Sequence, residues 1–159
     1  MAGQTTKTNF WLMKSEPSCY SIDDLKRDRK TLWDGVRNYQ VRNMIRDDMR
    51  VGDEVLFYHS NAGNETGVVG TMKIIKAAYP DPTQFDAKSE HPDPKSNPNE
   101  PRWFCVDIKF EKKFKRLVSL QEIKTDPKLK TMSVAKKGNR LSIMPVNAQH
   151  FNRVVKLGS

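Results

Sequence analysis

Cysteine is scarce in this sequence, and long apolar runs are absent. The 159 residues contain only two cysteines, Cys19 and Cys105, which are too few for a disulfide framework and lack the C-x-x-C spacing of a metal site. No apolar run approaches the roughly 20 residues that span a bilayer, and residues 1–8 lack the apolar core of a secretory signal. We therefore expect no membrane association and a protein inside the cell, with a bacterial cytoplasm favoured over a eukaryotic nucleus.

Acidic residues are scarce in one part of the chain only. Residues 1–100 contain 14 Lys and Arg against 15 Asp and Glu, whereas residues 101–159 contain 14 against 4. The net charge of +9 therefore comes from the last third of the chain. Basic charge favours polyphosphate partners, because neutralising phosphates releases counterions and adds affinity without sequence preference. We expect a nucleic acid as partner, and a merely soluble basic surface is the alternative interpretation.

The length and the apolar pattern predict one small domain of the α+β class. A chain of 159 residues fits a single compact domain, and we take it to be a monomer by default. Helices are expected after Ser21, which begins a capping box, at the apolar positions Val41 and Ile45, and after Asn147. Strands are expected over 9–14, 54–59, 67–78, 103–114 and 141–146. This pattern favours a mixed β-barrel decorated with short helices.

Proline gathers in residues 79–101, which contain six of the nine prolines and hardly an apolar side chain. The composition predicts a long surface loop. Connections longer than about 12–15 residues are uncommon in compact domains and are often functional, so we expect this loop to flank a binding site. A protein–protein module that uses the loop is an alternative function, in which deletion of residues 86–100 abolishes the role and Trp33→Ala does not.

Three short runs each join an aromatic ring to hydrogen-bonding side chains. They are residues 11–17 (WLMKSEP), 33–38 (WDGVRN) and 58–60 (YHS). This mixture suits a pocket for a flat ligand with polar edges, such as a nucleobase. The sequence shows no nucleophile paired with a base and no set of ligands at metal spacing. We therefore expect a binding protein with no catalytic residues, no cofactor and no metal.

These runs, together with the box Ser21-x-Asp23-Asp24-Leu25, Gly52-Asp53 and residues 141–143 (LSI), resemble the signature of the EVE domain family. The resemblance extends over residues 9–157 and leaves residues 1–8 as an expected disordered tail. It implies a PUA-like β-barrel related to PUA, ASCH and YTH domains, which bind nucleic acid, and EVE domains are implicated in recognising modified bases. The position of Trp33 is similar to that of a cage tryptophan in YTH domains. The other cage aromatics of YTH domains have no counterparts here, so N6-methyladenine specificity is not implied.

The predicted site has two parts. Trp33 is expected to stack on the base, with a core tryptophan as the alternative, and Lys14, Ser15 and Asn38 are expected to read its edge. The full base-pocket set is Trp11, Lys14, Ser15, Trp33, Arg37, Asn38, Tyr58, His59, Ser60, Leu141 and Ser142. The phosphate-binding set is Arg42, Lys112, Lys113, Lys136, Lys137 and Arg140.

The predicted function is a non-catalytic module that recognises a modified base in an aromatic-walled pocket. A methyl or hydroxymethyl group changes stacking area more than hydrogen bonding, so an aromatic wall is a suitable detector. The first choice of ligand is DNA that carries a modified cytosine, such as 5-methyl- or 5-hydroxymethylcytosine. A binder of modified RNA and an enzyme that acts on modified nucleotides are the alternatives.

Overall fold

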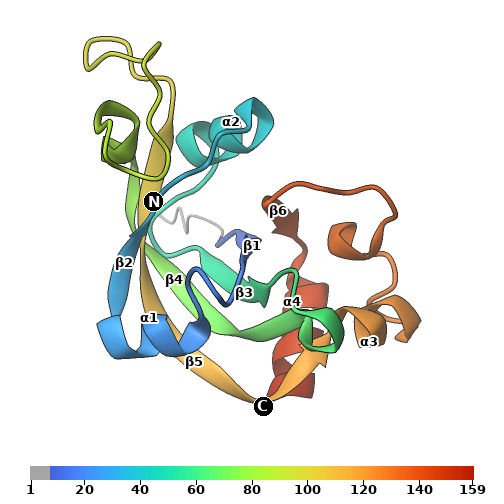
Figure 1. Ribbon diagram of the computed structural model, residues 1–159. Coiled ribbons are helices and arrows are strands. Elements are labelled where there is room, and N and C mark those ends of the chain that lie inside the picture. The colour runs from blue at the N-terminus through green and yellow to red at the C-terminus, as the bar shows by residue number, and fades with distance from the viewer. Residues whose placement is uncertain (1–7) are drawn as a thin grey trace, which may run out of the picture.

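In the part of the chain that the structure describes, six strands form one mixed sheet in the order β2-β5-β4-β3-β1-β6 (Figure 1). The computed structural model describes residues 8–159, so the predicted tail lies outside the described residues except for Thr8. The strands are β1 (Phe10–Ser15), β2 (Lys30–Trp33), β3 (Glu54–His59), β4 (Gly67–Pro80), β5 (Phe104–Ser119) and β6 (Ile143–Val146). β1 runs parallel to β3, and the other neighbouring strands are antiparallel. The α+β class and the mixed β fold are confirmed, and the sheet is open between β2 and β6.

Among the described residues, four short α-helices cover the sheet, and their boundaries follow from local capping. They are α1 (Ile22–Asp28), α2 (Tyr39–Asp47), α3 (Leu120–Thr125) and α4 (Ala148–Gly158). Ser21 begins α1 with the predicted capping box, because its hydroxyl accepts the amide of Asp24 while the Asp24 carboxylate accepts the amide of Ser21. The Asn38 side chain caps α2, and the Asn147 side chain caps α4. Within residues 8–159, each helix is too short or too polar to traverse a bilayer.

Strand β2 is absent from the strands predicted from the sequence. No strand was expected over residues 30–33, whereas Lys30–Trp33 pairs with β5 and places Trp33 opposite Val106. The turn between α1 and β2 is made by Arg29, whose φ of 71° is unusual for a residue other than glycine. Neither glycine nor proline marks this turn, so the sequence carried no signal for it.

The sheet separates two hydrophobic cores. The first core lies under α1 and α2 and contains Trp33, Ile45 and Phe57, and the second core lies under α3 and α4 and contains Leu56 and Tyr58. Side chains of β3 alternate between the two cores, because successive residues of a strand point to opposite faces. Figure 1 shows β6, α3 and α4 together on one side of the molecule, away from α1 and α2.

A Pro-rich segment, residues 81–103, connects β4 to β5 and begins with the 3₁₀ turn Pro82–Phe85. It lies on the surface, as predicted, but it is firmly anchored. The buried Gln84 side chain donates to the carbonyls of Asp81 and Trp103, at 2.7 and 2.8 Å. Its amide oxygen accepts from the Ser96 hydroxyl at 2.6 Å. One polar side chain therefore joins the start, middle and end of the segment.

Candidate functional site

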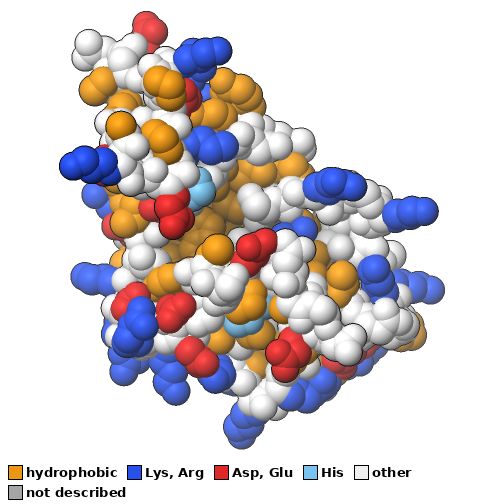
Figure 2. All heavy atoms as spheres, in the orientation of Figure 1, with side chains coloured by type: hydrophobic (Ala, Val, Ile, Leu, Met, Phe, Trp, Pro, Cys, Tyr) orange, Lys and Arg blue, Asp and Glu red, His pale blue; other side chains and the backbone are white. Residues whose placement is uncertain are grey.

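A cavity of about 380 Å³ opens between β1, β2 and the Pro-rich segment. Its volume lies within the range of about 300–1,000 Å³ that is typical of small-ligand pockets. Figure 2 shows the corresponding hollow, with hydrophobic side chains on its floor. The lining residues are Lys14, Ser15, Cys19, Tyr20, Thr31, Leu32, Trp33, Asp34, Glu90 and His91.

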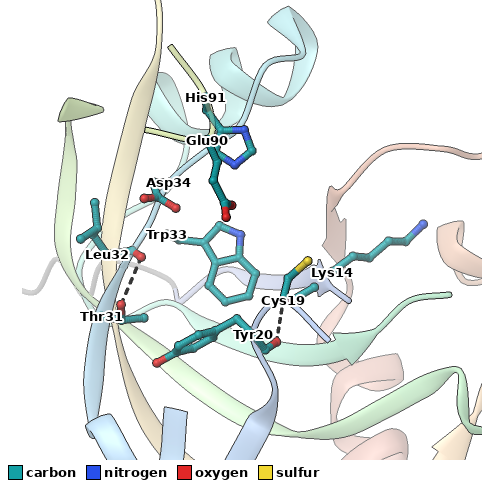
Figure 3. A pocket seen from close by; sticks show the side chains of 10 residues that line it. Lys14, Cys19, Tyr20, Thr31, Leu32, Trp33, Asp34, Glu90 and His91 are labelled. Carbon is teal, nitrogen blue, oxygen red and sulfur yellow. Dashed lines mark hydrogen bonds between the residues drawn. The ribbon is translucent and has the colours of Figure 1, made fainter. Parts of the chain in front are cut away.

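Trp33 forms the inner wall of the cavity and is also part of the first core. Its side chain is only 9% exposed, and its ring meets that of Phe57 edge to face, with the centroids 5.5 Å apart. The remaining surface of the indole faces the cavity (Figure 3). The Trp33 side chain is therefore both a core residue and part of the cavity wall, the two positions that the sequence left as alternatives.

Three titratable side chains gather around Trp33. Asp34 comes from the end of β2, and Glu90 and His91 project toward the indole from the Pro-rich segment (Figure 3). Burial in this recess raises the pKa of Asp34, and the nearby charge of Asp81 raises it further. Carboxylates accept hydrogen bonds from amino groups, so this rim is suited to a ligand that donates from its edge.

None of these three side chains was predicted from the sequence to line the pocket. Asp34 lies within a motif that was singled out, but Glu90 and His91 are separated from it by more than fifty residues and lie in a loop without periodicity. The only available signal was the expectation that the Pro-rich segment flanks the site. Among the residues that the structure describes, no group of three or more His, Cys, Asp or Glu side chains is placed to hold a metal ion.

Gly35 allows the Pro-rich segment to approach β2 closely. Its φ is 79°, a region in which L-residues with a Cβ atom are strained. A Cβ atom at this position would lie 2.6 Å from Cδ2 of His91, closer than real contacts allow. The backbone conformation therefore favours glycine, and a larger residue would also displace the imidazole that packs over it.

Asp81 anchors the rim of the cavity to the segment that follows Trp33. Its buried carboxylate accepts from the amides of Gly35 and Thr83, each at 2.8 Å, and from the Arg37 guanidinium at 3.2 Å. Arg37 in turn donates to the carbonyl oxygen of His91. Burial alone would raise the pKa of Asp81, but the hydrogen bonds from Thr83, Gly35 and Arg37 outweigh it and lower the pKa. Arg37, predicted to line the pocket, thus holds the pocket wall from outside.

Lys14 and Ser15, at the end of β1, do line the cavity. The Ser15 hydroxyl donates to the carbonyl of Tyr20 at 2.7 Å, which fixes the turn that carries Cys19 and Tyr20. The Lys14 side chain extends away from Trp33 in Figure 3, and its Nζ lies 5.6 Å from the centroid of the Tyr58 ring. Burial lowers the pKa of Lys14. The ammonium group is therefore placed to meet a negative group outside the cavity, not the centre of a base.

Two predicted pocket aromatics lie elsewhere. The Trp11 indole N–H donates to the buried Asp53 carboxylate at 2.9 Å, and Tyr58 is buried in the second core. Neither lines the cavity: Tyr58 points to the opposite face of the sheet, and Trp11 lies in the first core near the start of β1, away from the end that carries Lys14 and Ser15. The Asn38 side chain is likewise occupied, since it accepts the amide of Val41 at 3.0 Å as the cap of α2.

The other predicted pocket residues support the cavity without lining it. His59 Nε2 accepts the amide of Ile22 at 3.1 Å, which places its imidazole at the start of α1. The Ser60 amide donates to the carbonyl of Ser15 at 3.0 Å, and the carbonyl of Ser142 accepts from the amide of Lys14 at 2.8 Å. Leu141, beside Ser142, packs against both cores.

The predicted phosphate-binding residues are distributed over three regions. Arg42 lies on α2 and donates to the carbonyl of Arg102 at 2.9 Å. On β5, Lys113 pairs with Asp23 at 2.7 Å and Lys112 donates to the Ser159 hydroxyl at 2.7 Å. The exposed Lys136, Lys137 and Arg140 precede β6. They do not form one surface, and Arg42 lies beside the Pro-rich segment that forms the rim.

Comparison with known proteins gives consistent matches over nearly the whole chain. The EVE domain pattern matches residues 9–157. Human thymocyte nuclear protein 1 is 43% identical over 169 residues, which cover 94% of this chain and 74% of that protein. A crystal structure of a Pseudomonas syringae protein, 44% identical, superposes with a TM-score of 0.89 and covers 94% of this chain and 99% of that one. Human thymocyte nuclear protein 1 solved in complex with DNA containing 5-methylcytosine is 42% identical, with a TM-score of 0.86 and coverage of 95% and 98%.

Proposed function

Because the chain belongs to the EVE domain family, we propose that it is a DNA-binding module that holds a modified cytosine in the cavity beside Trp33. The observation that carries this proposal is the cavity itself, with an aromatic wall and two carboxylates at its rim. The complex of the human relative with DNA containing 5-methylcytosine supports the choice of ligand. We take 5-methylcytosine as the first ligand and 5-hydroxymethylcytosine as the second.

The carboxylates of Asp34 and Glu90 supply the base selectivity in this proposal. Cytosine presents an exocyclic amino group that donates a hydrogen bond, and acidic side chains are its usual acceptors in proteins. Thymine presents a carbonyl oxygen at the same position, so a carboxylate facing it would leave two acceptors opposed. The rim therefore favours cytosine and its derivatives over thymine, although both fit beside an indole.

The 5-methyl group is detected through contact with apolar lining atoms. Leu32 and the ring of Tyr20 line the cavity together with Trp33. Burying one methyl group contributes about 0.8 kcal/mol, which corresponds to a preference of about fourfold over unmodified cytosine. Because the cavity is set into the protein, the base must leave its stack to enter, as in other proteins that flip a nucleotide.

The compartment follows from the ligand in this proposal. The relatives include a bacterial protein and eukaryotic proteins that are named for the nucleus. We therefore propose that the protein works where cellular DNA lies, in the cytoplasm of a bacterium or in the nucleus of a eukaryote. Modified RNA remains the second choice of ligand, and RNA oligonucleotides in the assay below test it.

The test measures binding of matched oligonucleotides that carry cytosine, 5-methylcytosine, 5-hydroxymethylcytosine or thymine at one position, at two salt concentrations. We expect wild type to prefer 5-methylcytosine about fourfold over cytosine. Asp34→Asn should reduce the discrimination against thymine, because the amide offers a donor as well as an acceptor. Asp86→Asn, at an exposed position of the Pro-rich segment outside the cavity lining, is the matched control. Equal binding of all four oligonucleotides by wild type would overturn the proposal.

Trp33→Phe is preferable to Trp33→Ala as a probe of the wall. Trp33 belongs to the first core, and truncating a buried tryptophan to alanine costs about 3–5 kcal/mol of stability. Phenylalanine keeps an aromatic ring against Phe57 but offers less area to a base. We expect Trp33→Phe to weaken binding of all cytosine oligonucleotides while the protein stays folded, as circular dichroism would verify.

An enzyme that acts on modified nucleotides is the second candidate, and one observation favours it. Asp34, Glu90 and His91 line one cavity and include groups that act as acids and bases in catalysis. Incubation with oligonucleotides and mononucleotides of 5-methylcytosine, followed by mass spectrometry, separates the two functions. Unchanged ligand supports the binding module, and any product that disappears in Glu90→Gln establishes the enzyme.

A further inference from the structure

Helix α2 carries a stripe of three side chains along one side of its buried face. Val41 and Ile45 are buried in the first core, whereas Tyr39, Arg42 and Arg46 follow one another at intervals of three and four residues. Residues at this spacing lie on one side of a helix. Tyr39 is 52% exposed and is one of three large hydrophobic side chains that are exposed among the described residues. We call these three residues the α2 stripe.

A continuous stack of side chains connects the α2 stripe to the rim of the cavity. The Arg37 guanidinium, which donates to the carbonyl of His91, lies 5.5 Å from the centroid of the Trp103 ring. Trp103 stacks on Tyr39 with the centroids 4.8 Å apart and the planes inclined by 29°. The Arg42 guanidinium lies 4.9 Å from the Tyr39 ring. The exposed ring of Tyr39 is therefore fixed in position relative to the cavity.

The charges of the stripe are suited to a phosphate backbone. Within residues 8–159, Arg46 forms its one ion pair with the neighbouring Asp47, at 2.8 Å, and both side chains are exposed. An exposed ion pair of this kind contributes little, so a phosphate can replace the carboxylate. The guanidinium group offers a planar fork of donors that matches phosphate oxygens. Figure 1 shows α2 next to the Pro-rich segment that carries Glu90 and His91.

We propose that the α2 stripe binds the DNA strand whose modified base occupies the cavity, with Arg42 and Arg46 on its phosphates and Tyr39 against a neighbouring base or sugar. This inference rests on the proposed function for the choice of DNA, and it adds a second contact site. Contacts to phosphate supply affinity and register, whereas contacts to the base supply identity. The stripe therefore sets how tightly the strand is held, and the cavity sets which base is accepted.

The test uses Arg46→Gln, because among the described residues the Arg46 side chain has no hydrogen bond or ion pair beyond Asp47. Arg27→Gln is the control, since Arg27 is also an exposed helical arginine that pairs with its next neighbour, Asp28, and with Asp24. Figure 1 shows α1, which carries Arg27, and α2 near opposite ends of β2. Affinities for the cytosine and 5-methylcytosine oligonucleotides are measured over a series of salt concentrations.

We expect Arg46→Gln to weaken binding of both oligonucleotides by the same factor and to reduce the slope of log affinity against log salt by about 0.9, the value of one phosphate contact. Tyr39→Leu keeps an apolar cover on Trp103 but removes the ring. It should weaken both oligonucleotides at least about fivefold without changing the salt slope, because base stacking is not a charge contact.

The outcomes separate this inference from the proposed function. If Arg46→Gln matches Arg27→Gln in affinity and slope, the stripe is not a DNA contact, and a preserved preference for 5-methylcytosine still supports the cavity. If Arg46→Gln reduces the salt slope but wild type shows no preference for 5-methylcytosine, the α2 stripe is supported as a DNA contact and the proposed recognition of the modified base is contradicted. Absence of binding to any oligonucleotide by wild type would overturn both.

Discussion

The rim of the cavity and the second core are held together by different kinds of interaction. Buried polar side chains hold the rim: Asp81 and Gln84 bind main-chain atoms of segments far apart in the sequence. The second core contains only apolar side chains at its centre, among them Leu56, Leu129 and Val154, each fully buried. Polar anchoring depends on direction and distance, whereas apolar packing depends mainly on volume.

This difference indicates how each region tolerates change. Apolar cores accept substitutions that conserve volume, and their loss affects stability throughout the domain. A polar anchor fixes the geometry of a few atoms, so its loss moves the groups that depend on it. We therefore expect changes in the second core to affect folding alone and changes at the rim to affect binding more than folding.

The largest effect on stability is expected from Leu129→Ala in the second core. Truncating a fully buried leucine removes apolar contacts and leaves a cavity, at a cost of about 2–5 kcal/mol in the free energy of unfolding. Urea unfolding measures this loss, and the oligonucleotide assay should show an unchanged ratio of affinities for 5-methylcytosine and cytosine. A changed ratio would show that the second core and the rim are coupled, and would contradict the expectation that the second core affects folding alone.

A smaller loss of stability but a larger loss of selectivity is expected from Asp81→Asn. The amide keeps one acceptor oxygen but loses the charge that pairs with Arg37, so we expect a cost of about 1–3 kcal/mol. Because Asp81 also fixes Gly35, the rim should shift and the preference for 5-methylcytosine should fall. Thr83→Ser, which keeps its hydroxyl, serves as control; full selectivity in Asp81→Asn would mean that the rim does not depend on this anchor.

The smallest effect is expected at His59, which lies between the two regions. Burial lowers the pKa of His59, and the nearby charge of Lys113 lowers it further, whereas the charges of Asp23 and Glu65 act to raise it. The Nε2 atom of His59 accepts the amide of Ile22, a hydrogen bond that requires the neutral imidazole. The unfolded chain binds a proton near pH 6.5, and stability is therefore lost as the pH falls from about 6.5 toward the folded pKa. In His59→Gln the amide oxygen replaces the acceptor without titrating. Urea unfolding at about pH 7.5 and about pH 5.5 should show a smaller difference in this variant than in wild type.

Local signals were sufficient to predict most elements of the fold. The capping box at Ser21, the apolar spacing of Val41 and Ile45, and the cap at Asn147 each specify a helix through contacts within a few residues. The mixed sheet followed from the apolar runs and from the family resemblance. β2 was missed because four residues after a turn at Arg29 carry no pattern of their own and gain strand geometry only by pairing with β5.

The cavity was less predictable than the fold, because its lining depends on contacts distant in the sequence. Trp33, Lys14 and Ser15 were predicted and line it. Trp11 and Tyr58 are also aromatic residues in the same motifs, but Tyr58 points into the second core and Trp11 lies at the other end of β1. The presence of an aromatic residue in a motif does not indicate whether its side chain faces the cavity. The anchors Asp81 and Gln84 were not recognised, since polar residues in a Pro-rich stretch are usually exposed.

The double role of Trp33 bears on how this family can diversify. Its indole is shared between the first core and the cavity wall, so a lineage that alters it risks losing the fold. Glu90 and His91 lie on the Pro-rich segment, which Gln84 anchors through hydrogen bonds to main-chain atoms. Main-chain atoms are present whatever the side chain, so substitution of the residues that supply them leaves these hydrogen bonds possible. If the cavity binds a ligand as proposed, substitutions at Glu90 and His91 can therefore change which ligand is preferred while Trp33 stays unchanged.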